Sequence, residues 1–376
     1  MSKLEQLINE LCPEGVEYRR LENCCEILDN KRKPVTKSAR EAGKYPYYGA
    51  NGIQDYVSNY IFDGAFVLVG EDGSVVTEIG TPIVTWATGK IWVNNHAHII
   101  SEINGVLLRY LFHYLQTVPV KHLIHGNIPK LTGGDFRALK IALPPLPVQE
   151  EIVRILDKFM ELTAELTAEL TAELTARKQQ YEYYRDRLFA NYKSAPKKKL
   201  IEVADISRGI RVVKKQLISN GNYPVYQNSL APMGYYDKYN CNGNTTYVIS
   251  AGAAGEIGYC ETNFWAADDC LFFSNLREIN NKYIYYFLLT KQDFIYSNVR
   301  KASIPRLSRT VIENLQIPII SIDEQEQVLN LLNRFDKLCN DISEGLPAEI
   351  EARQKQYEYY RDKLLTFKKK EAAENE

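Results

Sequence analysis

The sequence lacks the features of a membrane or secreted protein. None of its apolar runs approaches the roughly 20 residues that cross a bilayer, and its N-terminal stretch holds no signal-peptide core. Its seven cysteines form no CxxC motif, so neither a disulfide framework nor a zinc site is expected from their spacing. We therefore expect a cytoplasmic protein with reduced thiols and no membrane partner.

Motifs for bond chemistry are also missing. The sequence has no GxSxG motif, no Walker A loop and no (Asn/Asp)-Pro-Pro-(Tyr/Phe) methyltransferase tetrad. The stretch SAGAAGEIG at 250–258 lacks the Lys-Ser/Thr ending of a phosphate loop, which favours a glycine-rich hairpin. His96 and His98 form an HxH pair with no carboxylate or cysteine close in sequence, so hydrogen-bonded buried histidines are expected rather than zinc ligands. We predict no catalytic residue, no metal site and no cofactor in this chain.

The charge is balanced, with a formal net charge of −1. A protein that binds nucleic acid unaided usually carries a clear basic excess. Residues 194–320, however, contain 15 Lys/Arg against 10 Asp/Glu. This distribution allows DNA binding by parts of the chain, with partners supplying much of the phosphate contact.

An internal repeat dominates what is present. ARKQQYEYYRDRL at 176–188 returns as ARQKQYEYYRDKL at 352–364, with ten of thirteen positions identical and an offset of 176 residues. The repeat extends upstream, where IPKL at 128–131 matches IPRL at 304–307. Further upstream the likeness thins and the offset changes. Each unit therefore consists of a variable body and a constant arm, which suggests two different recognition tasks on one framework.

The chain of 376 residues is long enough for two domains with additional elements. We predict an N-terminal helix at 1–13, body 1 at 14–147, a central helix at 148–193, body 2 at 194–320 and a C-terminal helical arm at 321–376. The expected class is α+β, with two globular α/β bodies separated by two long antiparallel helices and related by a pseudo-two-fold internal repeat.

Helical spacing defines both arms. Residues 148–192 contain neither Gly nor Pro, and include three tandem TAEL repeats at 163–174. The leucines of this region follow one another at i,i+4 and predict a stripe that packs against a second long helix: Leu162, Leu166, Leu170 and Leu174. Gly345 and Pro347 interrupt the second arm, which puts a continuous second helix in doubt.

Each body combines short strands, turns and a late amphipathic helix, and each contains a basic loop at a similar place. Lys and Arg neutralise phosphates, Arg pairs with guanine, and Asn and Gln pair with adenine. A solvated loop is the alternative for any single basic run. The candidate DNA contacts are Lys31, Arg32, Lys33, Lys37, Arg40, Asn51 and Lys130 in body 1, and Arg208, Arg211, Lys214, Lys215, Gln227, Asn228, Arg306 and Arg309 in body 2.

The doubled bodies, the QYEYYRD helix ends, the IPKL and IPRL segments, the NHAH stretch and above all the TAEL repeats resemble a type I restriction–modification specificity subunit. The resemblance covers the whole chain. It implies two target recognition domains that each read half of a bipartite site in double-stranded DNA, and helices that set the spacer between the halves. It also implies that the chain itself performs no catalysis.

The resemblance further implies partners. Two modification subunits would dock on the helices, near Tyr181, Tyr184, Tyr357 and Tyr360, and would carry S-adenosylmethionine for adenine methylation. Restriction subunits would add translocation and cleavage driven by ATP with Mg²⁺. Residues 2–12 are expected beside the C-terminal arm. Two alternatives stay open: a non-enzymatic scaffold with two protein-binding bodies, and a self-contained DNA methyltransferase, which the missing tetrad disfavours.

Overall fold

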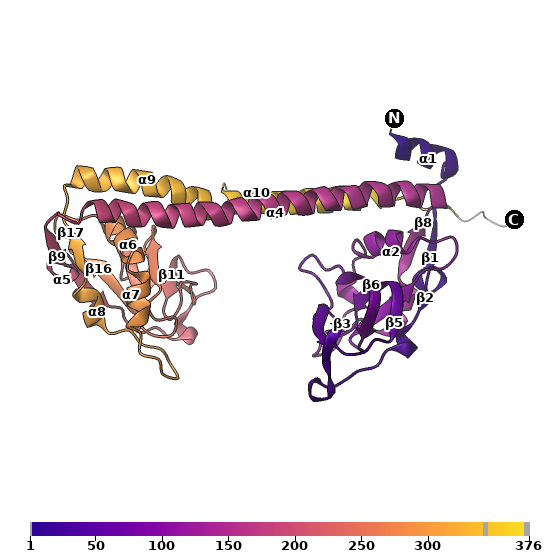
Figure 1. Ribbon diagram of the computed structural model, residues 1–376, viewed down its shortest axis with the longest axis horizontal. Helices are drawn as coiled ribbons and strands as arrows, with labels where there is room; N and C mark the ends of the chain where they lie inside the picture. The colour runs from indigo at the N-terminus through magenta and orange to yellow at the C-terminus, as the bar shows by residue number, and fades with distance from the viewer. Residues whose placement is uncertain (1, 341–344, 372–376) are drawn as a thin grey trace. The chain divides into compact units, whose positions relative to one another are not determined.

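The computed structural model describes residues 2–340 and 345–371 and divides the chain into two units. Unit 1 comprises residues 1–168 and 351–376, and unit 2 comprises residues 169–350. Each unit contains one body and portions of both arms, so unit 1 is built from the two ends of the sequence (Figure 1).

The helices include the predicted arms and the predicted late helix of each body. Unit 1 contains α1 (Lys3–Leu11), α2 (Leu108–Leu115) and α3 (Gly133–Ala138), and unit 2 contains α5 (Leu200–Val203), α6 (Asn281–Leu289), α7 (Gln292–Ser297), α8 (Arg309–Glu313) and α9 (Ile322–Asn340). Two helices extend from one unit into the other: α4 (Leu146–Asn191) and α10 (Leu346–Leu364).

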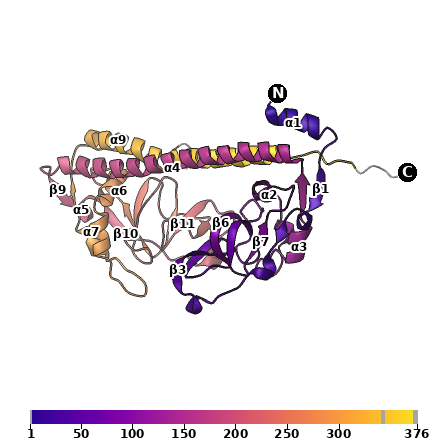
Figure 2. The ribbon, with the colours of Figure 1, turned by 45° about the vertical axis from the view of Figure 1, so that its right-hand side comes forward.

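The strands of body 1 form two sheets. A six-stranded sheet has the order β2-β7-β5-β6-β3-β4, and β1 pairs with β8. Helix α2 packs on the larger sheet against β5 and β6 (Figure 2). The bounds are β1 Glu17–Arg20, β2 Glu26–Ile27, β3 Ala42–Gly49, β4 Gly52–Val57, β5 Phe62–Gly70, β6 Val84–Val93, β7 Ala97–Ser101 and β8 Lys140–Leu143.

Body 2 has the same plan in three sheets, with orders β10-β16-β13-β14, β12-β11-β15 and β17-β9. The long strand β6 of body 1 corresponds to two short strands here, β14 and β15, which is why one six-stranded sheet becomes two sheets. The bounds are β9 Lys197–Lys199, β10 Asp205–Arg208, β11 Tyr223–Tyr226, β12 Gly234–Tyr236, β13 Thr245–Ile249, β14 Ile257–Cys260, β15 Trp265–Ala266, β16 Cys270–Ser274 and β17 Gln316–Pro318.

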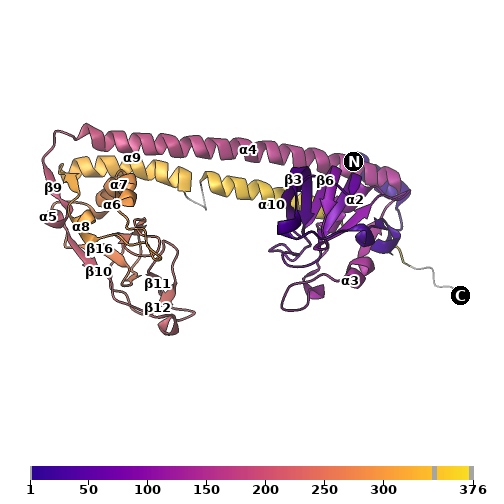
Figure 3. The same ribbon diagram turned by 60° about the horizontal axis from the view of Figure 1, so that its bottom comes forward.

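The arms pack within each unit through one apolar face. In unit 1 the ring of Phe159 on α4 lies 5.7 Å from that of Tyr360 on α10. In unit 2 the equivalent pair is exchanged between the arms, with Phe335 on α9 lying 5.9 Å from Tyr184 on α4. Because the start of α4 meets the end of the C-terminal arm and the end of α4 meets α9, the two arms run in opposite directions, as predicted (Figure 3).

Within the described residues the C-terminal arm contains two helices, α9 as far as Asn340 and α10 from Leu346. The interruption expected at Gly345 and Pro347 is therefore confirmed at the start of α10, and residues 341–344 lie outside the described part of the chain.

The two chain ends meet in unit 1. Lys3 on α1 pairs with Glu151 on α4 at 2.9 Å. The amide of Val16 donates to the carbonyl of Lys368 at 2.9 Å, and Leu365 belongs to the same buried cluster as Leu4. The predicted position of the N-terminal helix beside the C-terminal arm is thus confirmed.

The glycine-rich stretch 250–258 forms the connection from β13 to β14 and the first two residues of β14, and the two strands pair antiparallel. The predicted hairpin is therefore confirmed. No helix in the described ranges is both long and apolar enough to cross a membrane.

Candidate nucleic-acid interface

A buried glutamine attaches each body to its helix. Gln149 accepts a hydrogen bond from the amide of Leu107 at 3.0 Å, and its amide group donates to two backbone carbonyls, including that of Pro144 at 2.8 Å. Gln325, at an offset of 176 residues, makes the corresponding three bonds in unit 2. Buried backbone groups need such partners, so each glutamine fixes how its body leaves the arm.

A tryptophan holds the basic loop of each body. The indole N–H of Trp92 on β6 donates to the carbonyl of Lys33 at 2.7 Å. The indole N–H of Trp265 on β15 donates to the carbonyl of Ile210 at the same distance. Both loops also bond through their backbone to the residue that follows the tryptophan. The two basic loops therefore occupy equivalent positions although their sequences differ.

Body 2 gathers four predicted contacts around one cleft. Arg211 and Lys214 from the basic loop face Gln227 and Asn228, which follow β11, across a cleft of about 450 Å³. The remaining predicted residues of body 2 lie elsewhere on its surface. Arg208, Lys215, Arg306 and Arg309 are all exposed, and Arg309 pairs with Glu313 at 2.6 Å. Cations, an amide donor and an amide acceptor around one opening can contact both phosphates and base edges.

Body 1 leaves most of its predicted contacts exposed. Lys31, Lys33 and Lys37 lie on the surface, and Asn51 is exposed in the turn between β3 and β4. Lys130 is half-exposed and lies 3.1 Å from a carboxylate oxygen of Glu71.

Arg32 and Arg40 of body 1 were predicted to contact DNA, but both side chains are largely buried and pair with carboxylates of body 1. The Arg32 side chain is only 11% exposed, and its Nη1 donates to Glu71 and to the carbonyl of Ala97, both at 2.6 Å. Arg40 lies over the ring of Tyr47 at 4.2 Å and pairs with Asp55 at 3.2 Å. Their charges serve the internal structure of the basic loop, because carboxylates distant in sequence reach them.

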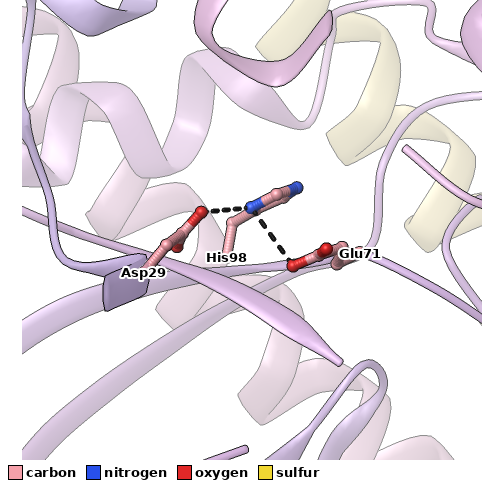
Figure 4. Close-up of side chains that lie close together, drawn as sticks. All are labelled: Asp29, Glu71 and His98. Atoms are coloured by element: carbon pink, nitrogen blue, oxygen red, sulfur yellow. Dashed lines mark hydrogen bonds and ion pairs between the residues drawn. The ribbon is translucent and has the colours of Figure 1, made fainter. Parts of the chain in front are cut away.

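Arg32 belongs to a buried ionic network centred on His98. Figure 4 shows three other members of the network, Asp29, Glu71 and His98. The Nδ1 atom of His98 lies 2.7 Å from Asp29 and 3.6 Å from Glu71. Burial raises the pKa of Asp29, but the hydrogen bond from His98 and the nearby positive charges outweigh it, so the pKa is lowered overall. The network joins segments that the sequence places far apart.

Asp29, Glu71 and His98 together have the donor types of a metal site. Their charges are already balanced, however, because Arg32 contacts Glu71 directly and lies 3.6 Å from Asp29, and Lys130 also faces Glu71. Nε2 of His98 lies 3.0 Å from the carbonyl of Leu131, which only accepts, so this nitrogen donates and Nδ1 faces the two carboxylates. The arrangement fits an ionic network that stiffens the loop better than a metal centre.

The HxH prediction needs correction at His96. Only His98 lies in β7; His96 precedes the strand, is 48% exposed and pairs with Asp72. The two rings therefore do not share a site. His98 is buried and hydrogen-bonded as expected, but its partner carboxylates come from residues distant in sequence.

The four predicted docking tyrosines form two equivalent pairs. Tyr181 and Tyr357 are both 6% exposed and belong to the packing between the arms, whereas Tyr184 and Tyr360 are 39% and 42% exposed. Only the second pair offers surface to a partner. Of the predicted stripe, Leu162 is 48% exposed, and Leu166, Leu170 and Leu174 are half-buried.

Comparison with known proteins identifies the class to which these features belong. The family model described as type I restriction modification DNA specificity domain matches the chain twice, at residues 13–176 and 193–352. Each match takes in one body and the adjoining helix. The chain belongs to this family.

Individual relatives agree. A putative type I restriction enzyme specificity subunit of Haemophilus influenzae is 37% identical over 94% of this chain and 96% of its own length. A type I restriction enzyme specificity subunit of Escherichia coli is 32% identical over 72% of this chain and 74% of its own. The S subunit of a type I system from M. genitalium has the same fold, with a TM-score of 0.52 and 17% identity over 93% of this chain and 96% of that structure.

The chain is thus a specificity subunit, which recognises DNA for a type I restriction–modification complex and leaves catalysis to other subunits. This assignment disfavours both the protein-binding scaffold and the self-contained methyltransferase.

Proposed function

We propose that each body reads one half of a bipartite DNA site. The observation that carries this proposal is that both bodies hold their basic loops through the same kinds of hydrogen bond. Two bodies of different sequence hold such a loop through the same tryptophan bond and attach to the arm through the same glutamine. Loops that are held in the same way but carry different side chains are suited to recognising two different DNA sequences on one framework.

In body 2, Arg211, Lys214, Gln227 and Asn228 are the leading contacts, since they share one cleft. In body 1 the leading contacts are the exposed Lys31, Lys33, Lys37 and Asn51 and the half-exposed Lys130. Alanine at a phosphate contact weakens binding to all sequences alike, whereas alanine at a base contact relaxes one position of the site.

The arms are proposed to dock two modification subunits, with Tyr184 and Tyr360 as equivalent contacts, and to associate with restriction subunits. S-adenosylmethionine would then belong to the modification subunits, and ATP with Mg²⁺ to the restriction subunits. The TAEL segment of α4 is proposed to set the length of the unread spacer between the two half-sites.

Exchange of one body tests half-site reading. Residues 14–143 are replaced by the corresponding body of another family member, and methylated adenines are mapped by long-read sequencing in cells that also express the modification partner. We expect one half of the methylated motif to change and the other to stay, because contacts on separate bodies add independently. A swap that changes both halves together contradicts the proposal.

A further inference from the structure

Among the exposed isoleucines of the two bodies, one in each lies at an equivalent place on a tight loop. Ile128 is 69% exposed and Ile304 is 54% exposed, and the two lie at the repeat offset of 176 residues. A single exposed apolar residue is ordinary. The same residue exposed at equivalent places in two bodies of different sequence indicates that both need it at the surface.

The backbone beneath each isoleucine is held firmly. In body 2, Arg300 and Arg306 exchange both backbone hydrogen bonds, at 2.8 and 3.1 Å, and so close the loop that carries Ile304. In body 1, His125 and Lys130 form the corresponding bridge below Ile128. The loop of body 2 projects below α7 and α8 as the long orange loop in Figure 1.

A proline follows each isoleucine, and its carbonyl is anchored. The amide of Gly73 donates to Pro129 at 2.9 Å, and the amide of Gly252 donates to Pro305 at 3.2 Å. Proline also fixes its own φ angle. The backbone that carries the isoleucine side chain is therefore preorganised, so little conformational entropy is lost when the side chain inserts into a partner.

The surroundings of both loops favour DNA over a protein surface. Exposed Arg300, Lys301 and Arg306 flank Ile304, and exposed His125 and half-exposed Lys130 flank Ile128. The loop of body 2 also lies next to the cleft lined by Arg211 and Asn228. Gly252, which binds the carbonyl of Pro305, is followed by Ala253, and the amide of Ala253 donates to the carbonyl of Asn228 at 2.9 Å. An apolar tip within a basic rim fits between stacked bases while the cations contact phosphates.

We propose that Ile128 and Ile304 are wedges that insert from the minor groove between neighbouring base pairs and kink the DNA at each half-site. The proposal rests on the function above, namely that each body binds one half-site. Wedges of this kind partly unstack one base step. Because pyrimidine–purine steps unstack most easily, each wedge would add sequence preference at a step that no polar side chain contacts.

The test uses the full chain assembled with its modification partner and a duplex that contains the mapped site. 2-Aminopurine is placed at successive steps of each half-site to report unstacking, and dyes at the duplex ends report bending by energy transfer. Wild type is compared with Ile128→Ala and Ile304→Ala. We expect each variant to lose the fluorescence rise in its own half-site, to bend the DNA less and to bind it on the order of tenfold more weakly.

The controls are Ile79→Ala in unit 1 and Ile201→Ala in unit 2. Each removes an exposed isoleucine that does not belong to these loops, with exposed fractions of 63% for Ile79 and 38% for Ile201. They should behave as wild type, and Ile304→Met should retain the unstacking signal because it keeps an apolar tip. The proposal would be overturned if Ile128→Ala and Ile304→Ala both gave the fluorescence and bending of the wild type. It would also be overturned if these variants assembled poorly with the modification partner while the complexes that did form bent the DNA normally. Neither result would affect half-site reading, which the body exchange tests separately.

Discussion

At the scale of residues, burial distinguishes cations that stabilise the fold from the candidate DNA contacts. Arg32 and Lys33 are neighbours in one basic loop, yet Arg32 lies among Asp29 and Glu71 whereas Lys33 is exposed. Removing one member of a buried ion pair leaves its partner charged and desolvated.

Arg32→Ala should therefore destabilise unit 1 by about 3 kcal/mol. Lys33→Ala should leave stability unchanged within about 0.5 kcal/mol and weaken DNA binding by the assembled complex. Denaturant unfolding and binding titrations at fixed salt measure the two effects. An Arg32→Ala variant of normal stability with weakened DNA binding would return Arg32 to the DNA contacts.

His113 gives unit 1 a dependence on pH. Its side chain is fully buried and its Nε2 lies 2.7 Å from Asp157. Burial lowers the pKa of His113 from 6.5 to about 4, with the hydrogen bond to Asp157 opposing the shift. The unfolded chain thus takes up a proton between pH 6.5 and 4 that the folded chain does not, so stability is full above this window and falls as the pH drops through it.

Unit 2 supplies the matched variant. Tyr286 and Asn333 occupy the equivalent positions and bond at 2.8 Å without a titrating histidine. The wild type should lose about 2 kcal/mol more stability between pH 7 and pH 5 than the double variant His113→Tyr/Asp157→Asn. Unfolding midpoints at the two pH values measure this difference; equal losses would show that His113 does not carry the effect.

The sequence predicted these residues unevenly. The basic loops were visible as patterns in the sequence. The burial of Arg32 was not, because its partners Glu71 and Ala97 lie 39 and 65 residues away in the sequence. Local composition predicts where charge gathers, but only tertiary packing decides which charges face inward.

At the scale of elements, the helices were the most predictable part. Periodic leucines and the absence of glycine and proline predicted α4 almost to its ends, since helix formation depends on near neighbours. The sheets were less predictable. Whether β6 runs on or divides into β14 and β15 depends on pairing with distant β3 and β11, and no short pattern contains that information.

The TAEL segment of α4 allows a direct test of spacer length. Deleting Thr171–Leu174 removes about 6 Å of helix and about 40° of net rotation. One base pair contributes about 3.4 Å and about 34°, so the spacer in the methylated motif should shorten by one base pair with both half-sites kept. Methylome sequencing of cells with the modification partner measures it.

A deletion of Thr171 and Ala172 alone is the control. It turns the following residues by about 200°, which moves the leucine stripe to the opposite face. Assembly or methylation should then be lost rather than shifted. An unchanged spacer after the four-residue deletion would refute the proposal that the TAEL segment sets the spacer length.

At the scale of the whole molecule, residues 365–368, which follow the C-terminal helix, stabilise the first body. Leu365 is 3% exposed and packs in the cluster that contains Leu4, Val16 and Ile152. The bonds from Val16 to Lys368 and from Tyr18 to Phe367 add to this closure. Unit 1 therefore completes its core only when the C-terminal arm has been made, whereas unit 2 is formed by one continuous stretch, residues 169–350.

Leu365→Ala should consequently destabilise unit 1 by about 2–4 kcal/mol through the cavity it leaves, although it lies more than 200 residues from body 1. Hydrogen exchange read by mass spectrometry should show faster exchange in β5 and β7 and unchanged exchange in β13 and β16, because the two units open separately. Leu332→Ala, which removes a fully buried leucine of unit 2, should give the reverse pattern. Equal loss of protection in both bodies from either variant would mean that the chain unfolds as a single cooperative body.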